Sequence, residues 1–151
     1  IRSIKTGEKL KQTYLIIYRA LNNENNFSKI SEEESLICKK IKEKYEFENL
    51  ILTYVIKNND LRFISIDKES MESNKHNHAQ YVQSGIVVDS KIVSSNSHNN
   101  ESLYEFYLLS SSLSGGPVRY KTVLNEGNKD NIFTLEEFEN ITYGLCYYYY
   151  G

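Results

Sequence analysis

The apolar residues of this chain fall into short runs separated by long polar segments. The two strongest runs occupy residues 13–19 (TYLIIYR) and 49–57 (NLILTYVIK), and both are rich in β-branched and aromatic side chains. Continuous apolar runs of this length are typical of strands buried on both faces of a sheet. Shorter runs of the same kind, bounded by polar turn residues, predict further strands. These lie at 61–66, 85–89, 91–93, 104–109 and 120–124.

A capping box predicts the start of a first helix. Ser31 is followed three residues later by Glu34, a spacing in which the serine oxygen accepts from the third helical N–H and the glutamate reaches back to the cap. The helix is expected to run to about Tyr45. Ile37, Ile41 and Tyr45 recur every four residues, so they are predicted to form its buried face.

Thr134 and Glu137 form a second capping box with the same spacing. The helix that follows is predicted to place Phe138, Ile141 and Leu145 on one face. Strands and helices in this order predict an α/β domain whose sheet is covered on both faces.

The polar segments between these elements are predicted to be surface loops. One of them contains His76 and His78, two residues apart. A histidine pair suggests metal binding, but no third ligand accompanies it, and His98 is equally isolated. We therefore predict no metal site. The loops are 20–29, 67–80, 94–102 and 110–117.

Composition narrows the class of protein. A chain of 151 residues, 40% hydrophobic and 25% charged, is typical of one globular domain. The net charge of −2 gives no global attraction to nucleic acid, so any such binding needs a local patch. No apolar run approaches the roughly 20 residues of a membrane helix. Cys38 and Cys146 are isolated, which favours a reducing cytoplasmic or nuclear compartment and predicts two small core residues.

The ends of the chain are unusual. It begins with Ile1 rather than Met and ends at Gly151, directly after four tyrosines at 147–150. We expect it to be a piece of a longer protein. The tyrosines are predicted to continue the last helix, where they pack against a neighbour or stack on bases.

Three groups of residues, taken together, resemble the C-terminal half of the PIWI domain of Argonaute proteins. Their order and spacing are similar to the family's "IIxYRDG…F", "GTVVD…IV…FDFYL" and "NxFTxDELQxLTYxLCxxY" patterns, and the resemblance covers about residues 14–149. The matching runs are IIYR at 16–19 before Phe27, then GIVVD at 85–89 with IV at 92–93 and EFYL at 105–108, then NIFT at 131–134 with ITY at 141–143 and LC at 145–146.

The resemblance implies a ribonuclease H-like α/β fold, a mixed sheet flanked by helices, in which residues 1–151 form a partial PIWI domain truncated at both ends. It also implies that a small guide RNA and its complementary target RNA are the partners. Cutting members of the family use two divalent ions, Mg²⁺ or Mn²⁺, held by a tetrad of Asp, Glu, Asp and His or Asp. Hard oxygen ligands suit such ions, which activate water and stabilise the leaving oxygen.

The expected catalytic aspartate is missing. Ala20 follows Tyr18-Arg19 where cutting members have Asp, and Leu21 stands where they have Gly. Alanine offers no ligand, and Glu24 lies too far along the loop to replace it. The other tetrad positions are expected before Ile1 and after Gly151, so this chain is predicted to contain no catalytic residue. Natural loss of the aspartate and an engineered substitution both remain open.

Four cations are candidates for contact with RNA phosphates. Lys57 and Arg62 fall in the stretch that follows the second strong strand, where the family carries basic side chains. Arg119 and Lys121 follow the Gly-Gly-Pro of the loosely matching loop at 110–120. The plainer alternative is that Lys57 and Arg62 are solvated turn charges and that the glycines form a tight turn.

The leading hypothesis is an Argonaute-like module that binds guide and target RNA in gene silencing without cutting, together with silencing-complex proteins and away from membranes. Two alternatives remain open. One is an interaction scaffold that keeps the fold but has lost RNA binding. The other is a cutting enzyme whose aspartate became Ala20, in which case the metal ions belong to an active full-length form.

Overall fold

The structure is a computed structural model that describes residues 14–22, 25–57, 60–63, 82–90, 92–93, 104–110, 116–127 and 133–148. Several predictions therefore lie outside the described residues. These are the strand residues 64–66, the loops with His76, His78 and His98, and the chain ends.

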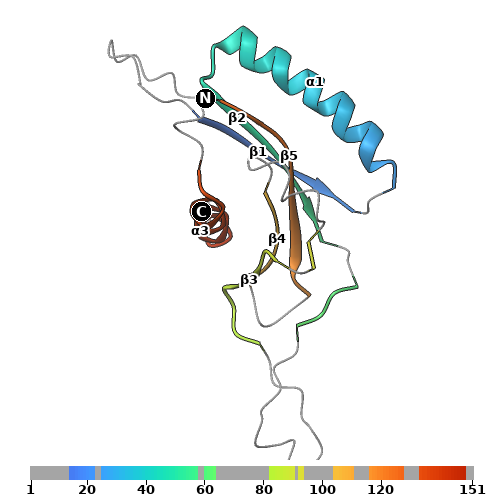
Figure 1. Ribbon diagram of the computed structural model, residues 1–151, viewed down its shortest axis with the longest axis vertical. Helices are drawn as coiled ribbons and strands as arrows, with labels where there is room; N and C mark the ends of the chain where they lie inside the picture. Colours follow the sequence, from blue (N-terminus) through green and yellow to red (C-terminus); the bar gives the residue numbers. More distant parts are fainter. Residues whose placement is uncertain are drawn as a thin grey trace, which may run out of the picture.

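Five strands form one mixed sheet, with the order β1-β2-β5-β4-β3 (Figure 1). β1 and β2 are parallel, whereas the other pairs are antiparallel. The parallel pair is joined by α1, because parallel neighbours need a crossover connection. The elements are β1 (Tyr14–Leu21), α1 (Phe27–Tyr45), β2 (Asn49–Ile56), β3 (Ile86–Val88), β4 (Glu105–Leu109), β5 (Val118–Glu126) and α3 (Leu135–Leu145).

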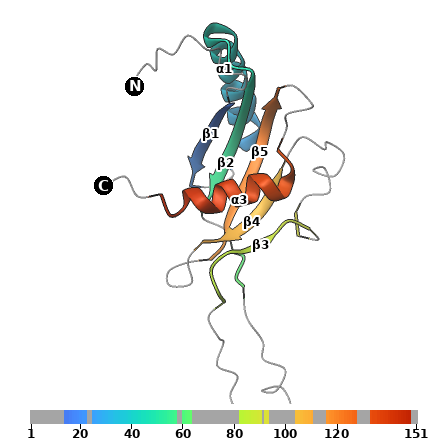
Figure 2. The ribbon, with the colours of Figure 1, turned by 90° about the vertical axis from the view of Figure 1, so that its left-hand side faces the viewer.

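Among the described residues, α1 and α3 cover opposite faces of the sheet, as predicted. α1 runs along one face, and α3 crosses the strands on the other (Figure 2). The core on the α3 side is built around Phe106 and Phe138, and the core on the α1 side around Leu52 and Tyr54. β2 lies between both cores and is the most completely buried strand, which explains its continuous apolar sequence.

β5 contains one extra residue relative to β2. Leu52 pairs with Leu124 and Thr53 pairs with Thr122, so Val123 has no opposite residue. This is a β-bulge, which shifts the alternation of side chains along one strand.

The first helix begins earlier than the sequence predicts. α1 starts at Phe27 after Asn26, whose φ of 59° is left-handed, a conformation that asparagine tolerates better than most residues. Ser31 therefore lies inside the helix, where its hydroxyl donates to the carbonyl oxygen of Ser28 instead of capping. The prediction failed because the Ser-Glu spacing also occurs one turn inside a helix.

The buried face of α1 also differs from the prediction. Cys38 is its buried residue, and Phe27 and Ile30 pack beside it. Ile37 and Tyr45 are instead 56% and 61% exposed. An earlier helix start adds Phe27 and Ile30 to the pattern, so the apolar stripe runs through Cys38.

The start of the second helix is as predicted. Thr134 accepts from the backbone N–H of Glu137, and the Glu137 carboxylate accepts from the backbone N–H of Thr134. Phe138 is fully buried, but Leu145 is 49% exposed. The helix ends at Leu145, so Tyr147 and Tyr148 do not continue it, and Cys146 is exposed rather than in the core.

The remaining strands differ in length from their predictions. β5 extends beyond 120–124 at both ends, whereas residues 61–63 and 92–93 are not in strands. In both of those segments, within the described residues, no neighbouring strand is available to complete a ladder of hydrogen bonds. Within the same residues, no helix combines the length and apolar character needed to cross a bilayer.

Candidate nucleic-acid interface

The carboxyl ends of the parallel strands β1 and β2 meet the beginning of β5 at one end of the sheet. Leu21 pairs with Ile56, which pairs with Arg119. Lys57 follows β2 directly, and Ala20 lies one position before the end of β1. In open α/β sheets, ligands bind beyond the carboxyl ends of the strands, so we take this edge of the sheet as the candidate interface.

Ala20 is exposed at this edge. Its neighbours in register are Val55 on β2 and, beyond it, Tyr120 on β5. Ile16 and Tyr18 pack into the core beneath α3, and side chains alternate with a period of two. The methyl group of Ala20 therefore lies on the α3 side of the sheet, in line with Tyr18.

The described residues around Ala20 do not fit a divalent metal ion. Alanine has no oxygen ligand, and Val55 beside it is apolar. Nowhere in the described ranges do three or more His, Cys, Asp or Glu side chains come together to hold a metal. Glu24 lies outside those ranges.

Arg19 is a further cation at this edge, in addition to the four that the sequence predicts as candidates. Its Nε donates to Oε1 of Glu34 at 3.1 Å, and its side chain is 51% exposed. The other carboxylate oxygen of Glu34 accepts from the hydroxyl of Tyr54 at 2.7 Å. Burial, followed by the neighbouring Glu34 carboxylate, raises the pKa of Tyr54 well above its usual range. Glu34 thus links α1 to both parallel strands, a role that its helical position alone does not reveal.

Arg119 is held in a buried ion pair. Its Nε donates to Oε1 of Glu105 at 2.9 Å, and only 16% of the Arg119 side chain and 3% of the Glu105 side chain are exposed. The guanidinium also lies over the ring of Tyr107, 5.8 Å from its centroid. The positive charge of Arg119 is thus neutralised within the protein by the Glu105 carboxylate.

Lys121 also makes an internal contact. Its Nζ lies 4.8 Å from the centroid of the Phe27 ring at the start of α1, a favourable cation–π geometry. Side chains at 119 and 121 project to the same side of β5, which is the side that α1 covers. The structure therefore places Arg119 and Lys121 on the α1 face, whereas Ala20 lies on the α3 face.

Lys57 and Arg62 are both exposed. Nη1 of Arg62 donates to the carbonyl oxygen of Leu61 at 2.6 Å. A side-chain carbon at Gly116 would come within 2.6 Å of that nitrogen and 2.8 Å of the Leu61 oxygen. Glycine is required here because the two segments approach closely. The contact brings the loop after β2 against the entry to β5.

A buried hydroxyl network lies behind Ala20. Tyr18 shares a hydrogen bond with Oγ1 of Thr142 at 2.8 Å, and Thr142 donates to the carbonyl oxygen of Phe138. Tyr120 contacts Sγ of Cys146 at 3.7 Å. Burial raises the pKa of Tyr18 and of Tyr120, the latter also through Cys146. Both phenols therefore stay neutral, and they fix α3 to the strands that carry the candidate interface.

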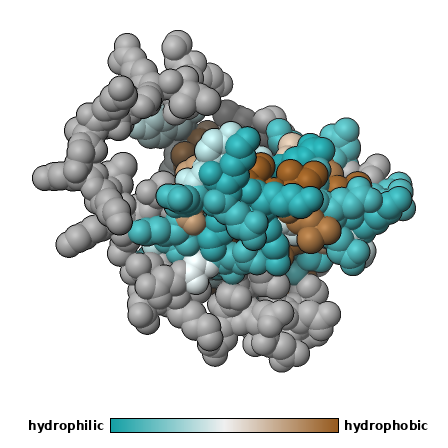
Figure 3. All heavy atoms as spheres, turned by 90° about the horizontal axis from the view of Figure 1, so that it is seen from above, coloured by the Kyte–Doolittle hydropathy of each residue, from teal (hydrophilic) through white to brown (hydrophobic). Residues whose placement is uncertain are grey.

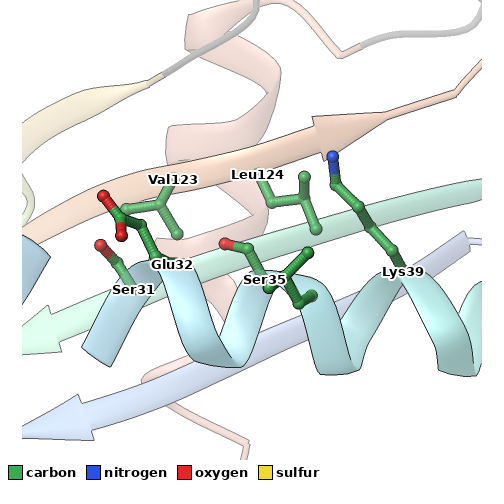
Figure 4. A pocket seen from close by; sticks show the side chains of 7 residues that line it. Ser31, Glu32, Ser35, Lys39, Val123 and Leu124 are labelled. Carbon is green, nitrogen blue, oxygen red and sulfur yellow. The ribbon is translucent and has the colours of Figure 1, made fainter. Parts of the chain in front are cut away.

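The outer surface of α1 is a separate feature. Figure 3 shows hydrophobic atoms set among hydrophilic ones, and the exposed apolar residues of α1 include Leu36 at 60%. A groove of about 430 Å³ runs between α1 and β5 (Figure 4). Lys39 in this groove pairs with Glu126 at 2.7 Å. The groove is lined by Ser31, Glu32, Ser35, Leu36, Lys39, Val123 and Leu124.

The described residues form a mixed five-stranded sheet with helices on both faces, an arrangement consistent with a ribonuclease H-like α/β fold. Residues 2–151 match the family model of the Piwi domain, and the chain therefore belongs to this family.

The fold is similar to that in the crystal structure of the C-terminal lobe of a budding yeast Argonaute, with a TM-score of 0.63 and 20% identity. The match covers 89% of this chain and 27% of the yeast chain, so the chain spans about a quarter of that lobe. No curated protein matches the chain.

Proposed function

We propose that this chain is an Argonaute-like nucleic-acid-binding module that holds a small guide RNA and its complementary target RNA, in RNA-mediated silencing, without cutting the target. The observation that carries this proposal is Ala20 at the exposed carboxyl end of β1 in a Piwi domain. The position keeps the strand and its packing but offers no metal ligand. The protein then acts in the cytoplasm or nucleus, together with silencing-complex proteins.

Lys57 and Arg62 support phosphate binding because both are exposed near the same edge of the sheet. Cationic side chains that neutralise phosphates supply most of the sequence-independent affinity for nucleic acid. In this mode, base pairing between guide and target selects the sequence, and the protein reads the shape of the backbone.

RNA bound to the full protein tests the proposal most directly. We expect the protein purified from its native host to carry short RNAs well above the level in a mock purification. A bound fraction no richer in short RNA than the mock would contradict guide binding.

Charge variants test where RNA binds. We expect Lys57→Ala with Arg62→Ala to weaken binding of a guide–target duplex and to reduce the salt slope by about one unit per lost phosphate contact. Lys40→Ala with Lys44→Ala is the matched control, because it removes two exposed cations from α1. Equal losses of duplex affinity in the two double variants would assign the effect to net charge rather than to this edge of the sheet.

Cleavage assays test the absence of cutting. We expect no metal-dependent cleavage of a guide-matched target with Mg²⁺ or Mn²⁺. Ala20→Asp restores the expected carboxylate, and cleavage by this variant alone would identify a cutting enzyme that lost one ligand. Cleavage by the unaltered protein would overturn the proposal.

A scaffold without RNA binding is the second candidate function. It is favoured by the internal pairing of Arg119 with Glu105 and the contact of Lys121 with Phe27. A scaffold would bind partner proteins, and the Lys57 and Arg62 variants would leave those complexes unchanged. The protein purified from its host would then contain no short RNA above the mock level.

A further inference from the structure

The second turn of α3 contains a buried carboxylate oxygen that lacks a partner. Oε1 of Glu139 is inaccessible to solvent and has no hydrogen-bond partner among the residues that the structure describes. A buried ionised oxygen without a donor is costly, and protonation is the usual way in which a protein avoids that cost.

Two further carboxylates act on Glu139. Asp89 directly follows β3, and Glu136 lies three residues earlier on α3; both repel a negative charge on Glu139. Among the described residues, the ion pairs of the chain lie elsewhere, on Glu34, Glu105 and Glu126. No cation within those residues offsets the acidic group, so ionisation of Glu139 adds a third negative charge to it.

The acidic group lies where α3 packs against β3. Val87 of β3 contacts the core cluster that contains Phe138 of α3. Gly85, just before β3, is so close to Tyr143 that an added side-chain carbon would lie 3.1 Å from the Tyr143 hydroxyl. A change in charge at Glu139 therefore acts on a packed contact between a helix and the edge strand of the sheet.

We propose that Glu139, together with Asp89 and Glu136, makes the packing of α3 on the end of β3 proton-linked. With the Glu139 carboxyl group protonated, its Oε1 atom stays buried and α3 stays packed. When the proton leaves to solvent, the carboxylate turns toward water and the contact with β3 loosens.

The direction of the pH dependence follows from the pKa. Burial first, then Asp89 and Glu136, raises the pKa of Glu139 from 4.5 to about 7. The pKa of Glu139 is higher in the folded chain than in the unfolded chain. The stabilisation that the protonated carboxyl group gives to the folded chain is therefore complete below about pH 4.5. It declines as the pH rises through 7.

Thermal unfolding of the full chain between pH 5 and pH 8 tests the proposal. Glu139→Gln mimics the protonated form. We expect the unfolding midpoint of this variant minus that of wild type to increase by about 2–4 °C from pH 5 to pH 8. Glu43→Gln on the exposed surface of α1 is the matched control and should follow the wild-type profile.

Carbon NMR of the Glu139 carboxyl group in the wild-type chain gives a direct second measurement that needs no variant. We expect its titration midpoint near 7, and a lower midpoint in Asp89→Asn. Amide exchange in the first two turns of α3 should also quicken from pH 6 to pH 8, beyond the intrinsic change in rate. A carboxyl group that titrates near 4.5, with parallel unfolding profiles for wild type and Glu139→Gln, would overturn the proposal.

Discussion

The hydroxyl of Tyr18 on β1 lies 2.8 Å from Oγ1 of Thr142 on α3, and the two residues are 124 positions apart in the sequence. Thr142 is only 2% exposed. This hydrogen bond joins the strand that carries Ala20 to the helix that covers it. Variants that remove the bond therefore test how the candidate interface is held in place.

We expect Thr142→Val to lower the free energy of unfolding by about 1–3 kcal/mol, because it removes the hydroxyl and leaves the phenol of Tyr18 without this partner. Tyr18→Phe should lower the free energy of unfolding by less. It removes the phenol hydroxyl, and the Thr142 hydroxyl can still donate to the carbonyl oxygen of Phe138. Urea unfolding of both variants and the double variant gives the coupling energy, expected at about 0.5–1.5 kcal/mol. Strictly additive losses would contradict the pairing.

The ion pair between Arg119 and Glu105 predicts a large asymmetry between variants. Arg119→Met leaves the Glu105 carboxylate buried without its cation, and we expect a loss of about 3–5 kcal/mol. Adding Glu105→Gln should recover most of that loss. Chemical denaturation measures both, and an unchanged stability in Arg119→Met together with a sharp loss of RNA affinity would show that Arg119 serves phosphate instead.

Two glycines should respond to alanine in opposite directions. Gly85 has a φ of 89°, and the new side chain would press on Tyr143, so Gly85→Ala should destabilise the protein by roughly 1–3 kcal/mol. Gly144 lies near the end of α3 with open space around the added carbon, so Gly144→Ala should stabilise it by about 0.5–1 kcal/mol. Thermal unfolding of the two variants separates the cost of backbone strain at Gly85 from the gain in helix propensity at Gly144.

The two Ser/Thr–Glu boxes should also behave differently. Thr134 caps α3, and Thr134→Ala is expected to cost about 1 kcal/mol. Ser31 lies inside α1, and Ser31→Ala should leave stability unchanged within about 0.5 kcal/mol. Equal costs for the two variants in thermal unfolding would mean that Ser31 begins the helix after all.

The strong strands and the final helix could be predicted from sequence because local patterns decide them. The β2 run is apolar on both faces, and the Thr134 box is complete in four residues. The start of α1 could not be predicted in this way, because Asn26 adopts a left-handed conformation that no short motif announces.

The candidate interface was predictable only in part. Ala20 and Lys57 could be placed because each lies at the carboxyl end of a strong strand, Ala20 just before the end of β1 and Lys57 directly after β2. The partners of Arg119 and Lys121 could not, because Glu105 and Phe27 reach them through strand register and helix packing. Arg19 was missed for the same reason, since its carboxylate partner lies on α1.

The bulge at Val123 has a consequence for how this domain tolerates changes in length. On the near side of the bulge, Tyr120 faces α3, and on the far side Leu124 faces α1. Removal of Val123 would reverse the orientation of one half of β5, sending either Leu124 out of its core or Tyr120 away from Cys146. Homologous sequences should therefore gain or lose residues at this strand only in pairs, whereas the loops beyond its ends are under no such rule.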